Sequence, residues 1–164
     1  MRKYGLFVDA SGTLFNEARS LEKALYDDAR IFIKEIQSRK LDNNELITGI
    51  ITNCGNEIHD ILRELKINDH FDHIICSDDV LSLKPSRKIF QYALSEAKLN
   101  PEQIFYIGDS LQNDAQGAQN SGMTGIWLNR YSSTLSDFTP QCSSLTEALE
   151  IIKRIVIVKN SKPK

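Results

Sequence analysis

The sequence is poor in the features that mark disulfide-rich, zinc-binding and membrane proteins. It has only three cysteines, Cys54, Cys76 and Cys142, and no CxxC pair. That set indicates neither a disulfide framework nor a structural zinc site. The first apolar run, residues 5–8, ends at an acid and is too short for a signal peptide or a membrane span. We therefore expect a cytoplasmic protein without a membrane segment.

An excess of charge of one sign is also missing. The 164 residues are 26% charged and 41% hydrophobic, with a formal net charge of −2. This balance is typical of a globular protein and gives no support to nucleic-acid binding. The length fits one domain with one core. We predict a single core domain over residues 1–158 and a loose basic tail over residues 159–164.

Apolar runs of strand length alternate with segments of helical periodicity. Nearly continuous apolar strands of this kind predict a parallel sheet covered by helices on both faces, a doubly wound α/β fold of about five strands. The predicted strands are residues 4–10, 45–53, 73–79, 103–110 and 124–130. The predicted helices are residues 20–40, 56–66, 85–98, with Pro85 in the first turn, 113–122 and 144–158, where the last could continue into extended structure.

Polar residues collect where these strands end. Ligands of open parallel sheets bind outside the carboxyl ends of the strands, so residues at those ends are candidates for one site. The candidates are Asp9 and Ser11 after the first strand, Thr52 and Asn53 after the second, Lys84 in the loop after the third, and Asp109 and Asp114 after the fourth. Other polar residues nearby have structural explanations: Asp78 and Asp79 as turn caps, Ser110 and Asn113 as residues that start a helix.

The candidate residue types favour phosphoryl chemistry with a metal. Crowded carboxylates repel one another, and a divalent cation relieves that repulsion. Ligands that are all oxygen atoms favour Mg²⁺ over zinc. A lysine and a threonine hydroxyl beside the metal suit the remaining oxygens of a phosphoryl group.

Four short stretches carry a family resemblance. DASGTLF, ITN, SLKP and IGDSLQNDAQGAQNSGM resemble, in order and spacing, the four motifs of the haloacid dehalogenase superfamily, whose commonest members are Mg²⁺-dependent phosphatases. The resemblance runs from about Leu6 to Arg130. It implies that Asp9 is a nucleophile that forms an aspartyl phosphate, and a carboxylate at this strand end can also be a metal ligand.

The resemblance also implies roles for the other candidates. Thr52 matches the hydroxyl that binds the phosphoryl group, and Lys84 matches the lysine that neutralises nucleophile and phosphate. We predict that Asn53, next to Thr52, also binds the phosphate. Asp109 matches a metal ligand, and Asp114 matches an acid at the metal or one shell out. The backbone carbonyl of Ser11 matches a further metal ligand.

Ser11 departs from the DxDGT pattern of the family's phosphatases. The second aspartate of that pattern is the general acid/base, and a serine hydroxyl has too high a pKa to take a proton from water near neutrality. Loss of acid/base help typically costs about 10² to 10⁴ in rate. P-type ATPases have threonine at this position, phosphonatases alanine and haloacid dehalogenases tyrosine.

The second departure is the absence of room for a cap domain. Between Phe15 and Thr52, and again between Asn53 and Lys84, the chain has room for only a helix and a strand. An open site must then gain specificity from loops, from an oligomeric neighbour or from a bulky substrate. The substrates we expect are phosphorylated small molecules or macromolecules.

Three functions remain open from the sequence. The first is a Mg²⁺-dependent phosphohydrolase that works through phospho-Asp9, slowed by Ser11. The second is a phosphate- and metal-binding interaction protein with little turnover. The third is a dehalogenase-type hydrolase, which the complete metal motif disfavours.

Overall fold

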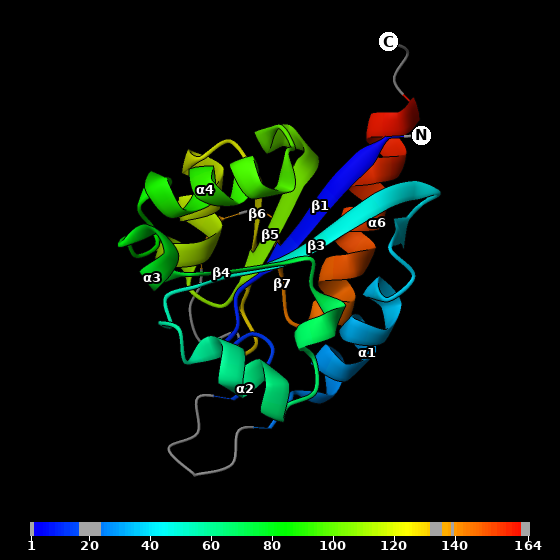
Figure 1. Cartoon of the computed structure of the whole chain (residues 1–164). Coiled ribbons are helices and arrows are strands. Elements are labelled where there is room, and N and C mark those ends of the chain that lie inside the picture. The colour runs from blue at the N-terminus through cyan, green and yellow to red at the C-terminus, as the bar shows by residue number, and fades with distance from the viewer. Residues whose placement is uncertain (1, 17–23, 132–135, 139, 162–164) are drawn as a thin grey trace.

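The protein is a mostly parallel seven-stranded sheet with β1 near its centre (Figure 1). The computed structural model describes residues 2–16, 24–131, 136–138 and 140–161. The strands are β1 (Lys3–Val8), β2 (Lys40–Leu41), β3 (Asn44–Thr52), β4 (His73–Cys76), β5 (Ile104–Gly108), β6 (Thr124–Leu128) and β7 (Gln141–Cys142). β1 pairs in parallel with β3 on one side and β5 on the other. β4 extends the sheet beyond β3, β6 and β7 extend it beyond β5, and β2 pairs with β3 in the antiparallel direction.

Helices cover both faces of the sheet, as predicted. The helices are α1 (Asp27–Ile36), α2 (Ile58–Glu64), α3 (Ser77–Val80), α4 (Arg87–Ala97), α5 (Gly117–Asn120) and α6 (Leu145–Ser161). One-turn helices occur at Asn68–His70 and Pro101–Gln103, and Leu111–Gln116 forms a π-helix, η3. The buried side chains of α1, α2 and α6 belong to one core cluster, and those of α4 and α5 belong to a second.

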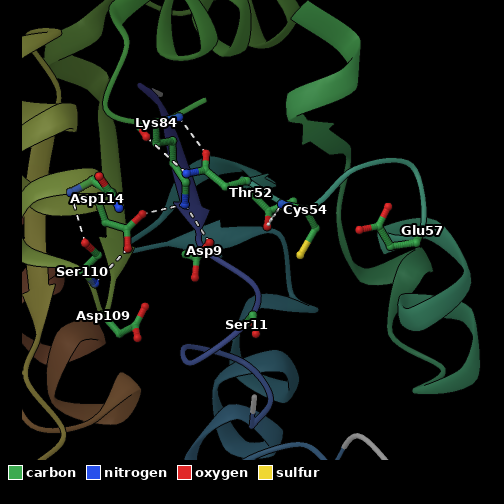
Figure 2. A pocket seen from close by; sticks show the side chains of 11 residues that line it. Asp9, Ser11, Thr52, Cys54, Glu57, Lys84, Asp109, Ser110 and Asp114 are labelled. Carbon is green, nitrogen blue, oxygen red and sulfur yellow. Dashed lines mark hydrogen bonds and ion pairs between the residues drawn. The ribbon is translucent and has the colours of Figure 1, made fainter. Parts of the chain in front are cut away.

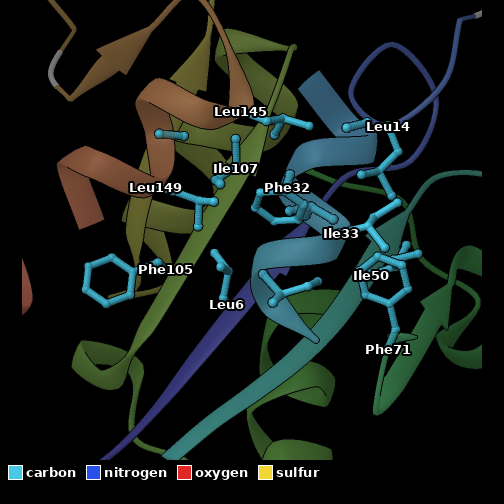
Figure 3. Close-up of a cluster of buried hydrophobic side chains, with 14 of the residues drawn as sticks. Leu6, Leu14, Phe32, Ile33, Ile50, Phe71, Phe105, Ile107, Leu145 and Leu149 are labelled. Carbon is cyan, nitrogen blue, oxygen red and sulfur yellow. The ribbon is translucent and has the colours of Figure 1, made fainter. Parts of the chain in front are cut away.

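The alternation of side chains along the strands divides the core into these two layers. Leu6 and Val8 of β1 join the layer under α1 and α6, whereas Phe7 joins the layer under α4. Figure 3 shows the first layer, in which Phe32 of α1 and Leu149 of α6 approach the strand side chains. Because both faces of the sheet are buried, the strand ends are the parts of the sheet that remain available for a ligand.

The starts of α1 and α4 differ from the prediction. α1 begins at Asp27 and not near residue 20, because Leu25 forms an isolated β-bridge with Phe15; residues 17–23 of the predicted helix lie outside the described part of the chain. α4 begins at Arg87 with Ser86 as its N-cap, so Pro85 precedes the helix. The Ser86 hydroxyl accepts a hydrogen bond from the backbone N–H of Lys88, which satisfies one free donor of the first turn.

The C-terminal helix is longer than predicted. α6 continues to Ser161, so residues 159–161 are helical and not part of a loose tail, and residues 162–164 lie outside the described residues. Its end is tied to β1 and to the residue before it: the Arg2 guanidinium donates to the carbonyl of Lys159, and the Tyr4 hydroxyl donates to the Asn160 side chain. Ile152 and Val156 are buried one turn apart, which favours helix over extended structure at this end.

Candidate active site

The carboxyl ends of β1, β3 and β5 meet at one cavity of about 470 Å³ (Figure 2). The parallel register sets Val8 beside Ile50 and Ile107, and the backbone N–H of Asp9 donates to the carbonyl of Ile107 at 2.8 Å. Every predicted site residue lines this cavity: Asp9, Ser11, Thr52, Asn53, Lys84, Asp109 and Asp114. Cys54, Glu57, Ser110 and Asn113 complete the lining.

Lys84 lies at the centre of a buried ionic cluster. Its Nζ is 2.7 Å from Asp9 Oδ1 and 2.6 Å from Asp114 Oδ1. The three residues are 5%, 6% and 1% exposed, respectively. An ammonium group buried to this degree needs such partners, since an unpaired buried charge is strongly destabilising. The lysine therefore fixes the position of the Asp9 carboxylate.

The positive charge of Lys84 does not fully offset the burial of Asp9 and the negative charge of the acids near it. Burial raises the pKa of Asp9, Lys84 lowers it, and the carboxylates of Asp114 and Asp109 raise it, with a result of about 7. Burial alone would lower the pKa of Lys84, but Asp9 and Asp114 raise it above its ordinary value. One lysine thus does not balance the acids around it, and a further cation would stabilise them.

Three of the acids could hold that cation. Carboxylate oxygens of Asp9, Asp109 and Asp114 all lie within 4.8 Å of one another, and Asp109 is exposed to solvent. The donor set is oxygen only, which fits Mg²⁺. The charge deficit at Asp9 and the closeness of the three carboxylates are the features of this structure that fit a divalent cation.

Tyr106 belongs to the ionic cluster and was not among the predicted site residues. Its hydroxyl accepts a hydrogen bond from Lys84 Nζ at 2.8 Å and donates to the carbonyl of Ile51 at 2.7 Å. It also lies 3.1 Å from Asp114 Oδ1. Burial and the nearby carboxylates of Asp114 and Asp9 raise its pKa well above the ordinary value. The sequence did contain an indication that Tyr106 has a polar partner, because a tyrosine inside a buried strand needs a partner for its hydroxyl.

The two residues after β3 have different tasks in the structure. The Asn53 side chain accepts from the backbone N–H of Lys84 at 2.6 Å and donates to the Lys84 carbonyl at 3.2 Å. It therefore holds the lysine loop in place. Thr52 Oγ1 accepts from the backbone N–H of Cys54 at 3.2 Å, which leaves the hydroxyl hydrogen to be donated to a ligand oxygen.

The polar residues predicted to cap turns and helices do so. Asp79 accepts from the backbone N–H of Cys76, and Asp78 accepts from that of Asn56. Ser110 is the N-cap of η3 and accepts from the backbone N–H of Asn113, so the helical segment begins at Leu111, two residues earlier than predicted. The backbone N–H of Ser110 also donates to Asp114 Oδ2 at 2.9 Å, so the start of η3 orients this acid toward Lys84.

Arg130 fixes the turn that follows Asp9, and it was likewise not predicted as a site residue. Its guanidinium donates to the carbonyl of Thr13 at 2.7 Å and pairs with Asp28 at 2.8 Å. Asp28 in turn accepts from the backbone N–H of Leu145 at the start of α6. The arginine also stacks over the ring of Tyr26. The turn after β1 is thus tied to α1, to α6 and to the segment after β6.

Gly12 is required for the approach of this turn to Asp109. Its φ is +80°, and a Cβ at this position would overlap the Asp109 carboxylate. We expect Gly12→Ala to lower the free energy of unfolding by about 1–3 kcal/mol and to weaken Mg²⁺ binding. Urea denaturation and calorimetric Mg²⁺ titration measure the two effects.

Gly122→Ala is the matched control for this prediction. Gly122 also has a positive φ, +85°, but its Cβ would meet Pro101, away from the cavity. We expect a similar loss of stability and unchanged Mg²⁺ affinity. Equal Mg²⁺ affinity in both variants would contradict the link between Gly12 and Asp109.

Comparison with known proteins agrees with this geometry. The haloacid dehalogenase-like hydrolase family matches residues 13–128. The chain is 40% identical over 92 residues to glyceraldehyde 3-phosphate phosphatase of Pyrococcus furiosus, which covers 54% of this chain and 38% of that protein. It is 36% identical over 86 residues to pyrimidine 5'-nucleotidase YjjG of Escherichia coli, which covers 51% of this chain and 38% of that protein.

A similar solved structure extends the comparison to the fold. The crystal structure of a HAD phosphatase from Thermococcus onnurineus superposes with a TM-score of 0.73 at 27% identity and covers 79% of this chain and 59% of that one. The chain spans about two fifths of the length of the two curated relatives, the phosphatase and the nucleotidase. Among the described residues, no helix has both the length and the apolar character to cross a membrane. The matched region includes the second and third motifs and the acids after β5, and this chain belongs to the haloacid dehalogenase-like hydrolase family.

Proposed function

We propose that the protein is a Mg²⁺-dependent phosphohydrolase that transfers the phosphoryl group of its substrate to Asp9. The observation that supports this most is the placement of Lys84 Nζ between Asp9 and Asp114 in a cavity that Asp109 and Thr52 also line. A carboxylate held by an ammonium group at the end of a parallel strand is suited to attack phosphorus. The phosphatase and nucleotidase names of the relatives support the same reaction class.

The contacts of Asp9 assign separate tasks to its two oxygens. Oδ1 is held by Lys84 at 2.7 Å, and Oδ2 accepts a weak hydrogen bond from the Thr13 hydroxyl at 3.4 Å. The better-held oxygen orients the carboxylate, and the other can approach phosphorus. Attack forms a bond from Asp9 to phosphorus and breaks the bond to the leaving oxygen, which splits hydrolysis into two steps.

Thr52 and Lys84 are the proposed phosphoryl-binding residues. The Thr52 hydroxyl can donate to one phosphoryl oxygen, and Lys84 opposes the negative charge that nucleophile and phosphate bring together. Asn53 was predicted to bind phosphate directly. Because its amide holds both backbone groups of Lys84, we propose that it acts by positioning the lysine.

Asp9, Asp109 and the backbone carbonyl of Ser11 are the proposed Mg²⁺ ligands. Both oxygens of Asp114 already accept hydrogen bonds, from Lys84 and from the backbone of Ser110, so we propose that Asp114 acts one shell out. When bound, Mg²⁺ would neutralise charge on the phosphoryl oxygens and orient them. The protein residues supply the nucleophile, the lysine and the hydroxyl.

The pKa of Asp9 makes Mg²⁺ binding dependent on pH. Burial raises this pKa to about 7, so the metal-free carboxyl is protonated below that pH. Mg²⁺ requires the carboxylate, and binding must therefore release a proton. We expect the apparent Mg²⁺ affinity to fall as the pH is lowered from 8 through about 7 to 6. Calorimetric titration in two buffers of different ionisation enthalpy measures the proton; its absence at pH 6.5 would contradict the prediction.

Ser11 is the basis of the second candidate function. Its hydroxyl lines the cavity but has too high a pKa to serve as general base. A protein that keeps the metal and phosphoryl sites and turns over slowly would act as a phosphate- or metal-binding partner. The complete ionic cluster around Asp9 favours the enzyme.

The open cavity limits how the protein can select its substrate. In the described part of the chain, the segments from β1 to β3 and from β3 to α4 contain α1, β2, α2, β4 and α3, and no separate cap domain. We propose that specificity comes from the loops, from a second copy of the chain or from a bulky substrate that covers the site. The substrate class is a phosphorylated small molecule, with phosphorylated macromolecules as the wider possibility.

Hydrolysis of an aryl phosphate by the wild type and by Ser11→Asp tests the proposal. We expect Mg²⁺-dependent hydrolysis by the wild type and a rate at least as high in Ser11→Asp, because the new carboxylate can act as acid and base. A silent wild type with an active Ser11→Asp variant would favour the binding protein. Silence of both, with intact Mg²⁺ binding, would contradict the phosphohydrolase.

A further inference from the structure

Glu57 is a cavity carboxylate to which the proposed reaction assigns no role. Figure 2 shows it across the cavity from Asp109, with its carboxylate directed toward Cys54 and the cavity. The other carboxylates of the lining belong to the group whose oxygens lie within 4.8 Å of one another. Glu57 is not part of that group, and its side chain is exposed to water.

The loop between β3 and α2 holds Glu57 in this place. Its Oε1 accepts from the backbone N–H of Gly55 at 3.2 Å, and Asp78 Oδ2 accepts from the backbone N–H of Asn56 at 2.9 Å. The residue directly precedes α2, and the buried Ile58 anchors the first turn of that helix. The carboxylate is therefore positioned by its loop and still able to exchange a proton with solvent.

We propose that Glu57 is the general base that hydrolyses phospho-Asp9, the task that Ser11 cannot perform. The proposal rests on the phosphohydrolase function. Glu57 accepts a proton from a water molecule while the water oxygen bonds to phosphorus. The bond between phosphorus and Asp9 breaks, its electron pair returns to the Asp9 carboxylate, and inorganic phosphate leaves. Glu57 then gives its proton to solvent, so that both carboxylates are restored.

Several other groups of the lining are less suited to this step. Ser11 and Ser110 carry hydroxyl groups, and Asn53 and Asn113 carry amides, none of which accepts a proton from water near neutrality. Lys84 is held as an ammonium by Asp9 and Asp114. Among the described residues that line the cavity, Glu57 is the carboxylate outside the cluster of Asp9, Asp109 and Asp114.

A burst experiment with p-nitrophenyl phosphate and Mg²⁺ separates the two chemical steps. Nitrophenolate is a good leaving group and departs without a proton, so a general base is needed only in the second step. We expect Glu57→Gln to form one phosphoenzyme per site at the wild-type rate and then to turn over about 10² more slowly. The result is a stoichiometric burst of nitrophenolate followed by a slow steady state.

Two further variants complete the test. Glu64→Gln removes an exposed carboxylate from the other end of α2 and should leave both phases unchanged. The double variant Ser11→Asp/Glu57→Gln should recover the steady-state rate of Ser11→Asp, because the new carboxylate replaces the lost base.

The outcomes distinguish this inference from the proposed function. An unchanged steady state in Glu57→Gln, or equal slowing of burst and steady state, overturns the role of Glu57 and leaves phospho-Asp9 intact. A wild type that forms no phosphoenzyme with Mg²⁺ overturns the phosphohydrolase itself, and the role of Glu57 with it.

Discussion

Asp9→Asn is expected to lower Mg²⁺-dependent phosphate hydrolysis by roughly 10⁵-fold or more, because an amide is a poor nucleophile and the two-step route is lost. Asn retains the size of the side chain and a carbonyl oxygen for Lys84, so the fold should persist. Steady-state hydrolysis of an aryl phosphate measures the loss, and circular dichroism checks the fold.

Asp9→Asn is expected to raise the free energy of unfolding of the metal-free protein above pH 5, although it lowers activity. Because the pKa of Asp9 is raised to about 7, its carboxylate disfavours the metal-free folded state above that pH, and the effect disappears below the ordinary value of 3.8. Asp9→Asn should therefore gain stability relative to the wild type as the pH rises from 5 to 8. Asp137→Asn, at a position away from the cavity lining, is the control for activity. Retention of hydrolysis by Asp9→Asn would contradict the aspartyl-phosphate route.

Lys84→Met is expected to destabilise the metal-free protein by about 3–5 kcal/mol at pH 8. The substitution leaves Asp9 and Asp114 buried, close together and without their shared ammonium group. The loss should be smaller at pH 6, where Asp9 takes up a proton. Hydrolysis should also be abolished, because the charge that opposes nucleophile and phosphate is gone.

Urea denaturation of Lys84→Met measures the stability effect. Lys88→Met, at an exposed position in the first turn of α4, is the matched control and should change stability by less than about 0.5 kcal/mol. The double variant Asp9→Asn/Lys84→Met should recover part of the loss, because one buried charge is removed with its partner. If Lys84→Met were as stable as the control, the ionic cluster could not be the core of the site.

The sequence was sufficient to predict where the site residues meet. Asp9, Thr52 and Asp109 each follow an apolar run, and parallel strands bring such ends to one edge whatever the details of packing. The start of α1 was not predictable in this way. The apolar period continues upstream through Leu25, but tertiary pairing with Phe15 takes that residue out of the helix.

Other features depend on contacts that no local pattern contains. β2 and β7 are two residues long and exist because longer strands lie beside them. The use of Asn53 to hold the Lys84 backbone depends on how two loops from different strands meet. The position of Tyr106 in a buried strand indicates that its hydroxyl has a polar partner. Only the folded structure identifies those partners as Lys84 and the carbonyl of Ile51.

Trapping of the covalent intermediate tests whether Asp9 carries the phosphoryl group during turnover. The wild type is mixed with an aryl phosphate and Mg²⁺, quenched, reduced with borohydride and digested, and the modified residue is located by mass spectrometry. We expect reduction at Asp9, which depends on Mg²⁺ and is absent from Asp9→Asn. Modification at another residue, or steady Mg²⁺-dependent phosphate release with no modified residue under single-turnover conditions, would contradict the aspartyl-phosphate route.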